Sequence, residues 1–168
     1  MENKDVSNYY GTKTNYKVRI YTDGYKHVGA GKAVTFKVNG KTYKIKTDKN
    51  GYAKLAVKLK AKKYTVTASY GGFKVSNKIT VKKLLSAKNL SKKRAKVTKF
   101  QAKLVNSKGN PLTGKKIAFK MEGKTYTGKT NSKGIATATI KIALKVGKHK
   151  IQSIYKKTKI TNTITIKK

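Results

Sequence analysis

The chain has 168 residues, with 43 lysine and arginine residues against 5 acidic ones, and a formal net charge of +38 at pH 7. It contains no cysteine, which excludes disulfide crosslinks and thiol chemistry. No stretch approaches the ~18 apolar residues of a membrane-spanning helix, and the first residues lack the apolar core of a secretory signal. We therefore expect either an intracellular protein or a piece of a longer secreted one.

The positive charge belongs to the whole chain and is nearly all lysine. Residues 1–84 have 20 basic and 4 acidic residues, and residues 85–168 have 23 and 1, so the halves carry +16 and +22. Arg19 and Arg94 are the only arginines. Such a charge attracts anions and opposes compaction. Two interpretations stay open: a solvated lysine shell on thin domains, or a surface that binds anions.

Strand patterns dominate the first half in chain order. Residues 1–13 either fray or supply a first strand. Apolar and polar residues then alternate over residues 34–38, 43–46, 53–59, 64–70 and 74–82. This period of two, with many Val, Ile, Thr and Tyr residues, is typical of strands with one buried face.

Turn residues separate these predicted strands. Asn39-Gly40 lies between two alternating segments, where it predicts a two-residue hairpin turn. Asp48–Gly51 and Gly71-Gly72 are turn sequences of the same kind. No segment has the 3.6-residue period of a helix, so we expect an all-β protein.

Residues 82–97 are mostly polar, and we interpret them as a linker plus the first strand of a second unit. A loop is expected at Gly109-Asn110-Pro111. The strands predicted for the second half cover residues 96–105, 116–121, 124–130, 135–142, 149–155 and 159–167.

The second half repeats the first. Gly31–Lys37 returns as Gly114–Lys120, 83 residues later, and Gly40–Tyr43 and Thr47–Gly51 return at the same spacing. A repeat this long holds a whole small domain. Six or seven short strands per copy predict two β-sandwiches, at residues 1–84 and 85–168. Their expected core residues are Val34, Phe36, Val57, Val66, Val81, Ile117, Phe119, Ile140, Ile151 and Ile166.

The repeated motifs resemble a known type of domain. The segments Gly31–Tyr43, Thr47–Gly51, Tyr64–Tyr70 and Ser76–Val81 are similar to the bacterial Ig-like repeat related to invasin and intimin, closest to the version in adhesin-like surface proteins of methanogenic archaea. The resemblance implies two tandem Ig-like β-sandwich domains, an extracellular location at the cell surface, and service as a stalk or in cell adhesion. It implies no catalytic residues.

Catalytic and metal sites are not expected. The acids are few and have no acidic counterpart in the other copy: Glu2, Asp5, Asp23, Asp48 and Glu122. His27 and His149 do not correspond either, and His149 replaces Tyr64 in a strand. The loop Asp48–Gly51 superficially resembles a calcium site, but Lys49 stands among its possible ligands. Hard cations need several oxygen ligands with negative charge. We expect no enzyme activity and no cofactor.

The expected partner is an anionic surface. Lysines on the outward strand faces are the candidate anion-binding residues: Lys44, Lys46, Lys54, Lys58, Lys129 and Lys141. An acidic polysaccharide, a cell wall or another cell surface fits them. Non-specific binding of nucleic acid is the main alternative, because phosphate neutralisation needs only lysines. A pure spacer is a third possibility. The sequence does not indicate an oligomeric state.

Overall fold

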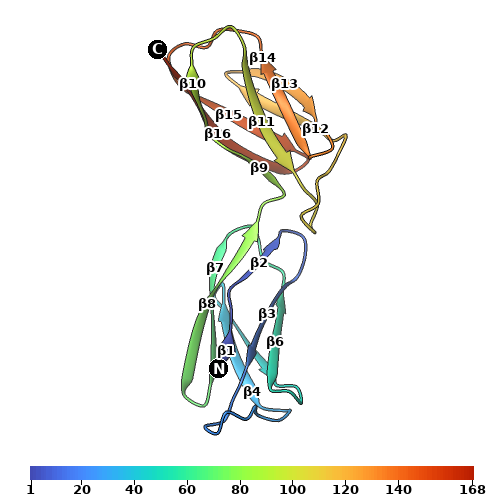
Figure 1. Ribbon diagram of the computed structural model, residues 1–168, viewed down its shortest axis with the longest axis vertical. Helices are drawn as coiled ribbons and strands as arrows, with labels where there is room; N and C mark the ends of the chain where they lie inside the picture. Colours follow the sequence, from blue (N-terminus) through green and yellow to red (C-terminus); the bar gives the residue numbers. More distant parts are fainter. The chain divides into compact units, whose positions relative to one another are not determined.

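The computed structural model describes residues 1–168 and contains strands but no helix (Figure 1). The chain divides into two compact units, Met1–Lys83 and Leu84–Lys168, here called the first and second domains. Each domain contains two packed sheets, so the predicted all-β fold with two sandwich domains is confirmed.

In the first domain, a three-stranded sheet with the order β1-β3-β6 packs against a five-stranded sheet with the order β2-β8-β7-β4-β5. Neighbouring strands are antiparallel, except that β2 pairs in parallel with β8. The strands are β1 (Glu2–Asn3), β2 (Val6–Tyr9), β3 (Thr14–Arg19), β4 (Ala33–Val38), β5 (Lys41–Lys46), β6 (Tyr52–Val57), β7 (Lys63–Tyr70) and β8 (Phe73–Lys82).

The second domain repeats this topology, with a sheet β14-β11-β9 and a sheet β10-β16-β15-β12-β13. Here β10 is parallel to β16. The strands are β9 (Leu85–Ala87), β10 (Leu90–Lys93), β11 (Thr98–Leu104), β12 (Lys116–Met121), β13 (Lys124–Lys129), β14 (Ile135–Ile140), β15 (Gly147–Tyr155) and β16 (Thr158–Lys167).

The opening segment of each domain contributes one strand to each sheet. Residues 1–13 form β1 and β2, and the segment interpreted as a linker plus one strand contains both β9 and β10. Asp5 lies between β1 and β2, where its carboxylate accepts a hydrogen bond from the backbone N–H of Lys78 at 2.8 Å. Asn89 accepts the equivalent bond from Thr163 at 3.0 Å. These bonds anchor the crossing between the sheets.

Each core contains an aromatic pair that joins the two sheets. Tyr16 of β3 meets Phe36 of β4 edge to face, with ring centroids 5.9 Å apart. Phe100 of β11 meets Phe119 of β12 in the same way at 6.1 Å. All ten predicted core residues are buried, so the assignment of the inward strand faces is confirmed.

The predicted turns are also confirmed. Asn39 and Gly40 both have positive φ, 51° and 74°, as a type I′ hairpin turn requires. Asp48 accepts hydrogen bonds from the backbone N–H groups of Asn50 and Tyr52, each at 3.0 Å. In the second domain the equivalent turn ends at Gly134. Only glycine fits there, because a Cβ would lie 2.4 Å from the carbonyl oxygen of Leu104.

We predict that Phe36→Ala lowers the free energy of unfolding of the first domain by about 3–5 kcal/mol, because it removes one ring of the aromatic pair and leaves a cavity beside Tyr16. This is a large part of a small domain's stability. Calorimetry of the full chain should show the first-domain transition moving down and the second unchanged.

Phe119→Ala is the matched variant and should move only the second-domain transition. A shift of both transitions by either substitution would contradict the assignment of two separate cores.

Candidate anion-binding surface

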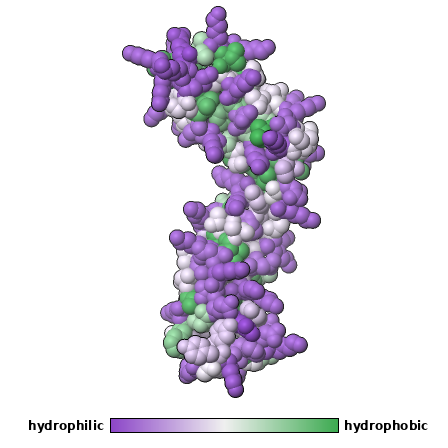
Figure 2. Space-filling view, in the orientation of Figure 1, coloured by the Kyte–Doolittle hydropathy of each residue, from purple (hydrophilic) through white to green (hydrophobic).

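Lysine covers the surface of both domains and is scarcely neutralised by carboxylates. Every lysine is exposed except the half-buried Lys92. Figure 2 shows hydrophilic side chains spread over the visible face of each domain. One ion pair joins a lysine to an acid, between Lys54 Nζ and Asp48 Oδ2 at 3.1 Å. The positive charge of the folded chain is therefore directed toward solvent.

The acids mostly serve local structure. The backbone N–H of Lys78 holds the pKa of Asp5 below its usual value, and the side chain of Asn77 adds to this effect. The pKa of Asp48 is also lowered, chiefly by its hydrogen bond from the backbone of Tyr52. Both carboxylates therefore stay charged at neutral pH, where they stabilise a crossing and a turn.

The six lysines proposed from the sequence are all exposed, and they lie at corresponding edges of the two domains. Lys44 and Lys46 lie on β5, and Lys54 and Lys58 lie on or just after β6. Strands β5 and β6 are edge strands of opposite sheets and contact each other. Four of the lysines therefore follow one edge of the first domain and belong to two faces.

In the second domain, Lys129 ends β13 and Lys141 directly follows β14. These strands are again edge strands of opposite sheets in contact. The proposed anion-binding lysines therefore follow the same pair of edge strands in each domain.

A denser group of cations surrounds Tyr52 on the outward face of the three-stranded sheet. Lys17 Nζ lies 4.8 Å from the centre of the Tyr52 ring, and Arg19 Cζ lies 4.9 Å from it. Lys54 Nζ follows at 5.8 Å. The register explains this, because Arg19 is opposite Tyr52 and Lys17 is opposite Lys54. Cations at such distances are attracted to the ring.

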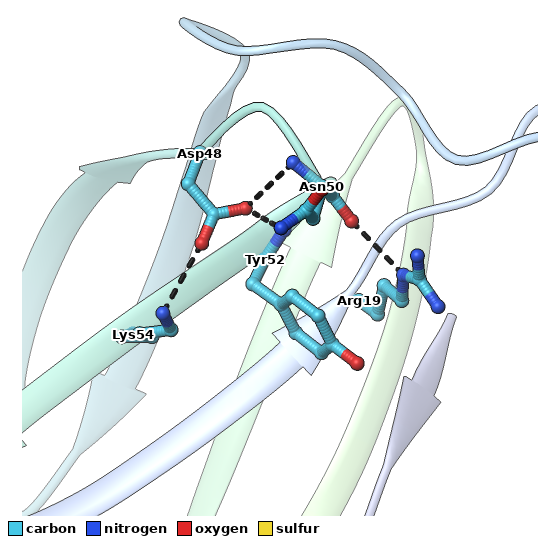
Figure 3. Close-up of polar contacts among 5 residues, drawn as sticks. All are labelled: Arg19, Asp48, Asn50, Tyr52 and Lys54. Carbon is cyan, nitrogen blue, oxygen red and sulfur yellow. Dashed lines mark hydrogen bonds and ion pairs between the residues drawn. The ribbon is translucent and has the colours of Figure 1, made fainter.

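The guanidinium of Arg19 is held in place. Its Nε donates to the carbonyl oxygen of Asn50 at 2.9 Å (Figure 3), and Nη1 donates to the Tyr21 hydroxyl at 3.3 Å. Lys17 and Arg19 were absent from the residues proposed from sequence. The alternation of buried Tyr16 and Val18 with these two cations is the signal that identifies the outward face.

The second domain lacks this group. The facing pair Lys17–Lys54 of the first domain corresponds to Gln101–Thr137 in the second. The facing pair Arg19–Tyr52 corresponds to Lys103–Ile135. One lysine remains there, without an aromatic ring. The two domains thus share a backbone and differ in their outward faces.

His149 lies in β15, as expected of a residue that replaces Tyr64 in a strand, and it also bonds to an equivalent backbone carbonyl. The Tyr64 hydroxyl donates to the carbonyl oxygen of Lys60 at 2.9 Å, and His149 Nε2 lies 2.8 Å from that of Lys145. His149 Nδ1 also bonds to the Glu122 carboxylate. Donation from both nitrogens requires the protonated ring. The hydrogen bond with Glu122, aided by that to Lys145, raises the pKa of His149.

The fold and surface define a pair of two-sheet β-sandwich domains with a lysine-rich exterior. The structure has no helix with the length and apolar character needed to cross a membrane. No group of three His, Asp or Glu side chains that could hold a metal ion is present.

No family model and no curated protein matches this chain. Solved structures similar to it include invasin, described as a bacterial integrin-binding protein, with 19% identity over 99% of this chain and 38% of that chain, and a TM-score of 0.42. The titin I9–I11 tandem matches at 12% identity over 99% of this chain and 64% of that chain, with a TM-score of 0.48.

The adhesin InvE of Yersinia pseudotuberculosis matches at 11% identity over 98% of this chain and 56% of that chain, with a TM-score of 0.39. The chain spans less than two thirds of the length of each of these structures. At these identities the likeness concerns the fold alone.

We predict that the second domain loses stability as pH rises. Because the pKa of His149 is raised on folding, its contribution is complete below the unfolded pKa of about 6.5 and is lost as pH rises through the folded value. The contribution is at most about 1 kcal/mol, since the Glu122 partner is solvent-exposed. Unfolding of wild type and His149→Tyr should be compared at pH values from about 5.5 to about 8.5.

Wild type should lose stability relative to His149→Tyr over that range. Glu122→Gln should remove most of this pH dependence, and the first domain should show none of it. A wild-type advantage that is constant with pH would contradict a charged His149–Glu122 pair.

Proposed function

We propose that this chain is a non-catalytic, adhesin-like module of an extracellular surface protein, and that its lysines attach it to anionic polysaccharide or cell wall without stereochemical choice. The observation that carries the proposal is the single lysine–carboxylate pair in a chain of net charge +38. The extracellular location rests on the sequence resemblance to surface-protein repeats.

The arrangement of the lysines supports attachment to a polymer rather than to a small anion. They occur on both domains and on opposite faces of each sandwich, so a long polyanion can contact many of them at once. Each exposed charge contributes little in water. A polymer that releases its condensed counterions on contact sums many such small contributions.

Non-specific nucleic-acid binding is the second candidate, and the same net charge favours it. Base recognition favours arginine and asparagine, and this chain has only two arginines. Single-strand binding combines open aromatic platforms with a positively charged groove, whereas the two most exposed rings, Tyr25 and Phe73, share a pocket with the acids Glu2 and Asp23. Any DNA binding would therefore be directed at the phosphates.

We predict that affinity for dextran sulfate and for duplex DNA falls linearly with salt on a log–log plot, since both contacts depend on counterion release. Fluorescence titrations from about 0.05 to about 0.5 M NaCl measure the slope. Replacing Lys44, Lys46, Lys54 and Lys58 together by Gln should lower the slope for DNA by about 0.9 for each lysine that contacts a phosphate.

The matched control replaces the same four lysines by arginine, which keeps the charge and should keep the slope. Thermal unfolding of both variants checks that the first domain remains folded. Tight binding to DNA alone would favour the second candidate. Salt-independent binding to dextran sulfate would contradict electrostatic attachment altogether.

A further inference from the structure

A hollow of about 450 Å³ lies at one end of the first domain. Its aromatic lining is Tyr21, Tyr25, Tyr70 and Phe73, with polar groups from Thr22 and Asp23 among them. Residues of the loop after β3 and of the β7–β8 hairpin line it. The hairpin is at the start of β8, the end of that strand far from Lys83 (Figure 1). We call this hollow the tip pocket. Its size is within the range of small-molecule sites.

The tip pocket holds the two most exposed large apolar side chains of the protein. Tyr25 is 91% exposed and Phe73 is 74% exposed, whereas the next, Val146, is 51% exposed. On a chain otherwise covered by lysine, two open aromatic rings beside one cavity mark an interaction surface.

The backbone at Tyr25 is unfavourable for a residue with a side chain. Tyr25 has a φ of 59°, in the left-handed region that favours glycine. Its N–H bonds to the carbonyl of Thr22, as the N–H of Gly109 bonds to that of Asn106 in the second domain. The turns are equivalent, and the second domain has glycine where the first has tyrosine. A strained residue with a fully open ring points to a role outside the fold.

The other aromatic residues of the pocket are also particular to the first domain. Tyr21 forms a bridge with His27, and the equivalent bridge joins Val105 to Pro111. Phe73 is opposite Tyr70 at its hairpin, and Thr158 takes its place opposite Tyr155. The second domain therefore keeps the framework and lacks three of the four rings.

The charges of the pocket differ from those of the rest of the surface. Glu2 and Asp23, two of the five acids in the chain, line it together with one lysine, Lys74. Asp23 has no hydrogen-bond or ion-pair partner in the protein, and the Glu2 carboxylate accepts a bond from the Tyr21 hydroxyl at 2.8 Å. A polyanion is disfavoured beside two carboxylates, and a cation is disfavoured by the net charge of +38.

A neutral ligand with a flat apolar face and several hydroxyl groups suits this combination. Its face packs against the exposed rings, and its hydroxyls donate to the carboxylates of Asp23 and Glu2. We propose that the tip pocket binds a neutral sugar unit of a glycan. This inference goes beyond the electrostatic attachment proposed above and stands or falls independently of it, because binding of a neutral sugar does not depend on salt.

The test is a titration of the full chain, followed by NMR chemical shifts, with cellotetraose, maltotetraose, chitotriose and mannotriose in about 0.5 M NaCl, where surface charges are screened. At least one of these should bind, with shifts at the tip-pocket residues. Tyr25→Gly should weaken that binding at least about tenfold. The same substitution should leave the melting temperature of the first domain unchanged or higher, because it relieves the backbone.

The matched control is Tyr10→Ala, which removes an exposed tyrosine outside the pocket and should leave the affinity unchanged. Asp23→Asn should weaken binding without unfolding the domain. Failure of all four sugars to bind would overturn the proposal. So would sugar binding that Tyr25→Gly does not weaken, or binding of tetramethylammonium in place of the sugars.

Discussion

Repulsion among lysines is the constraint on which the rest of this structure depends. The first domain carries +16 and the second +22, each on a two-layer sandwich of modest size. With one lysine–carboxylate pair in the chain, the surface opposes folding. Cohesion comes from the buried strand faces, and above all from the aromatic pairs Tyr16–Phe36 and Phe100–Phe119, which join the sheets. The acids are used where they fix the backbone, as Asp5 and Asp48 do.

A comparison of equivalent positions in the two domains distinguishes residues that maintain the fold from surface residues that are free to differ. At positions with a structural role the residue type changes but the hydrogen bond is kept. Asn131 replaces Asp48 and accepts the same turn hydrogen bond, and His149 replaces Tyr64 and bonds to the equivalent backbone carbonyl. Equivalent residues on the outward faces of the two domains differ in type and do not share contacts. Tyr52 is opposite Arg19, whereas Ile135 is opposite Lys103. The first domain thus presents aromatic groups that the second lacks, on a shared framework.

Much of the fold was predictable because its signals are local. The period of two identified the inward faces, so that Phe36 and Phe119 were recognised as core residues, and Asn39-Gly40 identified its hairpin turn. The opening strands were less predictable. Both β1 and β9 are three residues long or shorter, and the parallel pairing of β2 with β8 depends on residues more than seventy positions apart. Alternation does not reveal such long-range pairing.

The surface was predictable in its charge and not in its grouping. Exposure of Lys44 and Lys54 follows from alternation, but the gathering of Lys17, Arg19 and Lys54 around Tyr52 depends on the register of β3 with β6. The tip pocket depends on two loops that meet only in the folded domain. The positive φ of Tyr25 cannot be predicted from the residues around it. Only alignment with Gly109 of the second domain points to it.

The lysine charge remains almost uncompensated in the folded protein, with one lysine–carboxylate pair for a net charge of +38. The most direct measurement is the melting temperature of both domains as a function of NaCl concentration. Both transitions should rise with salt, mostly below about 0.15 M, because the screening length falls to about 8 Å at that concentration. Melting temperatures that stay constant or fall over that range would contradict it, since they would show that the charges are already balanced within the fold.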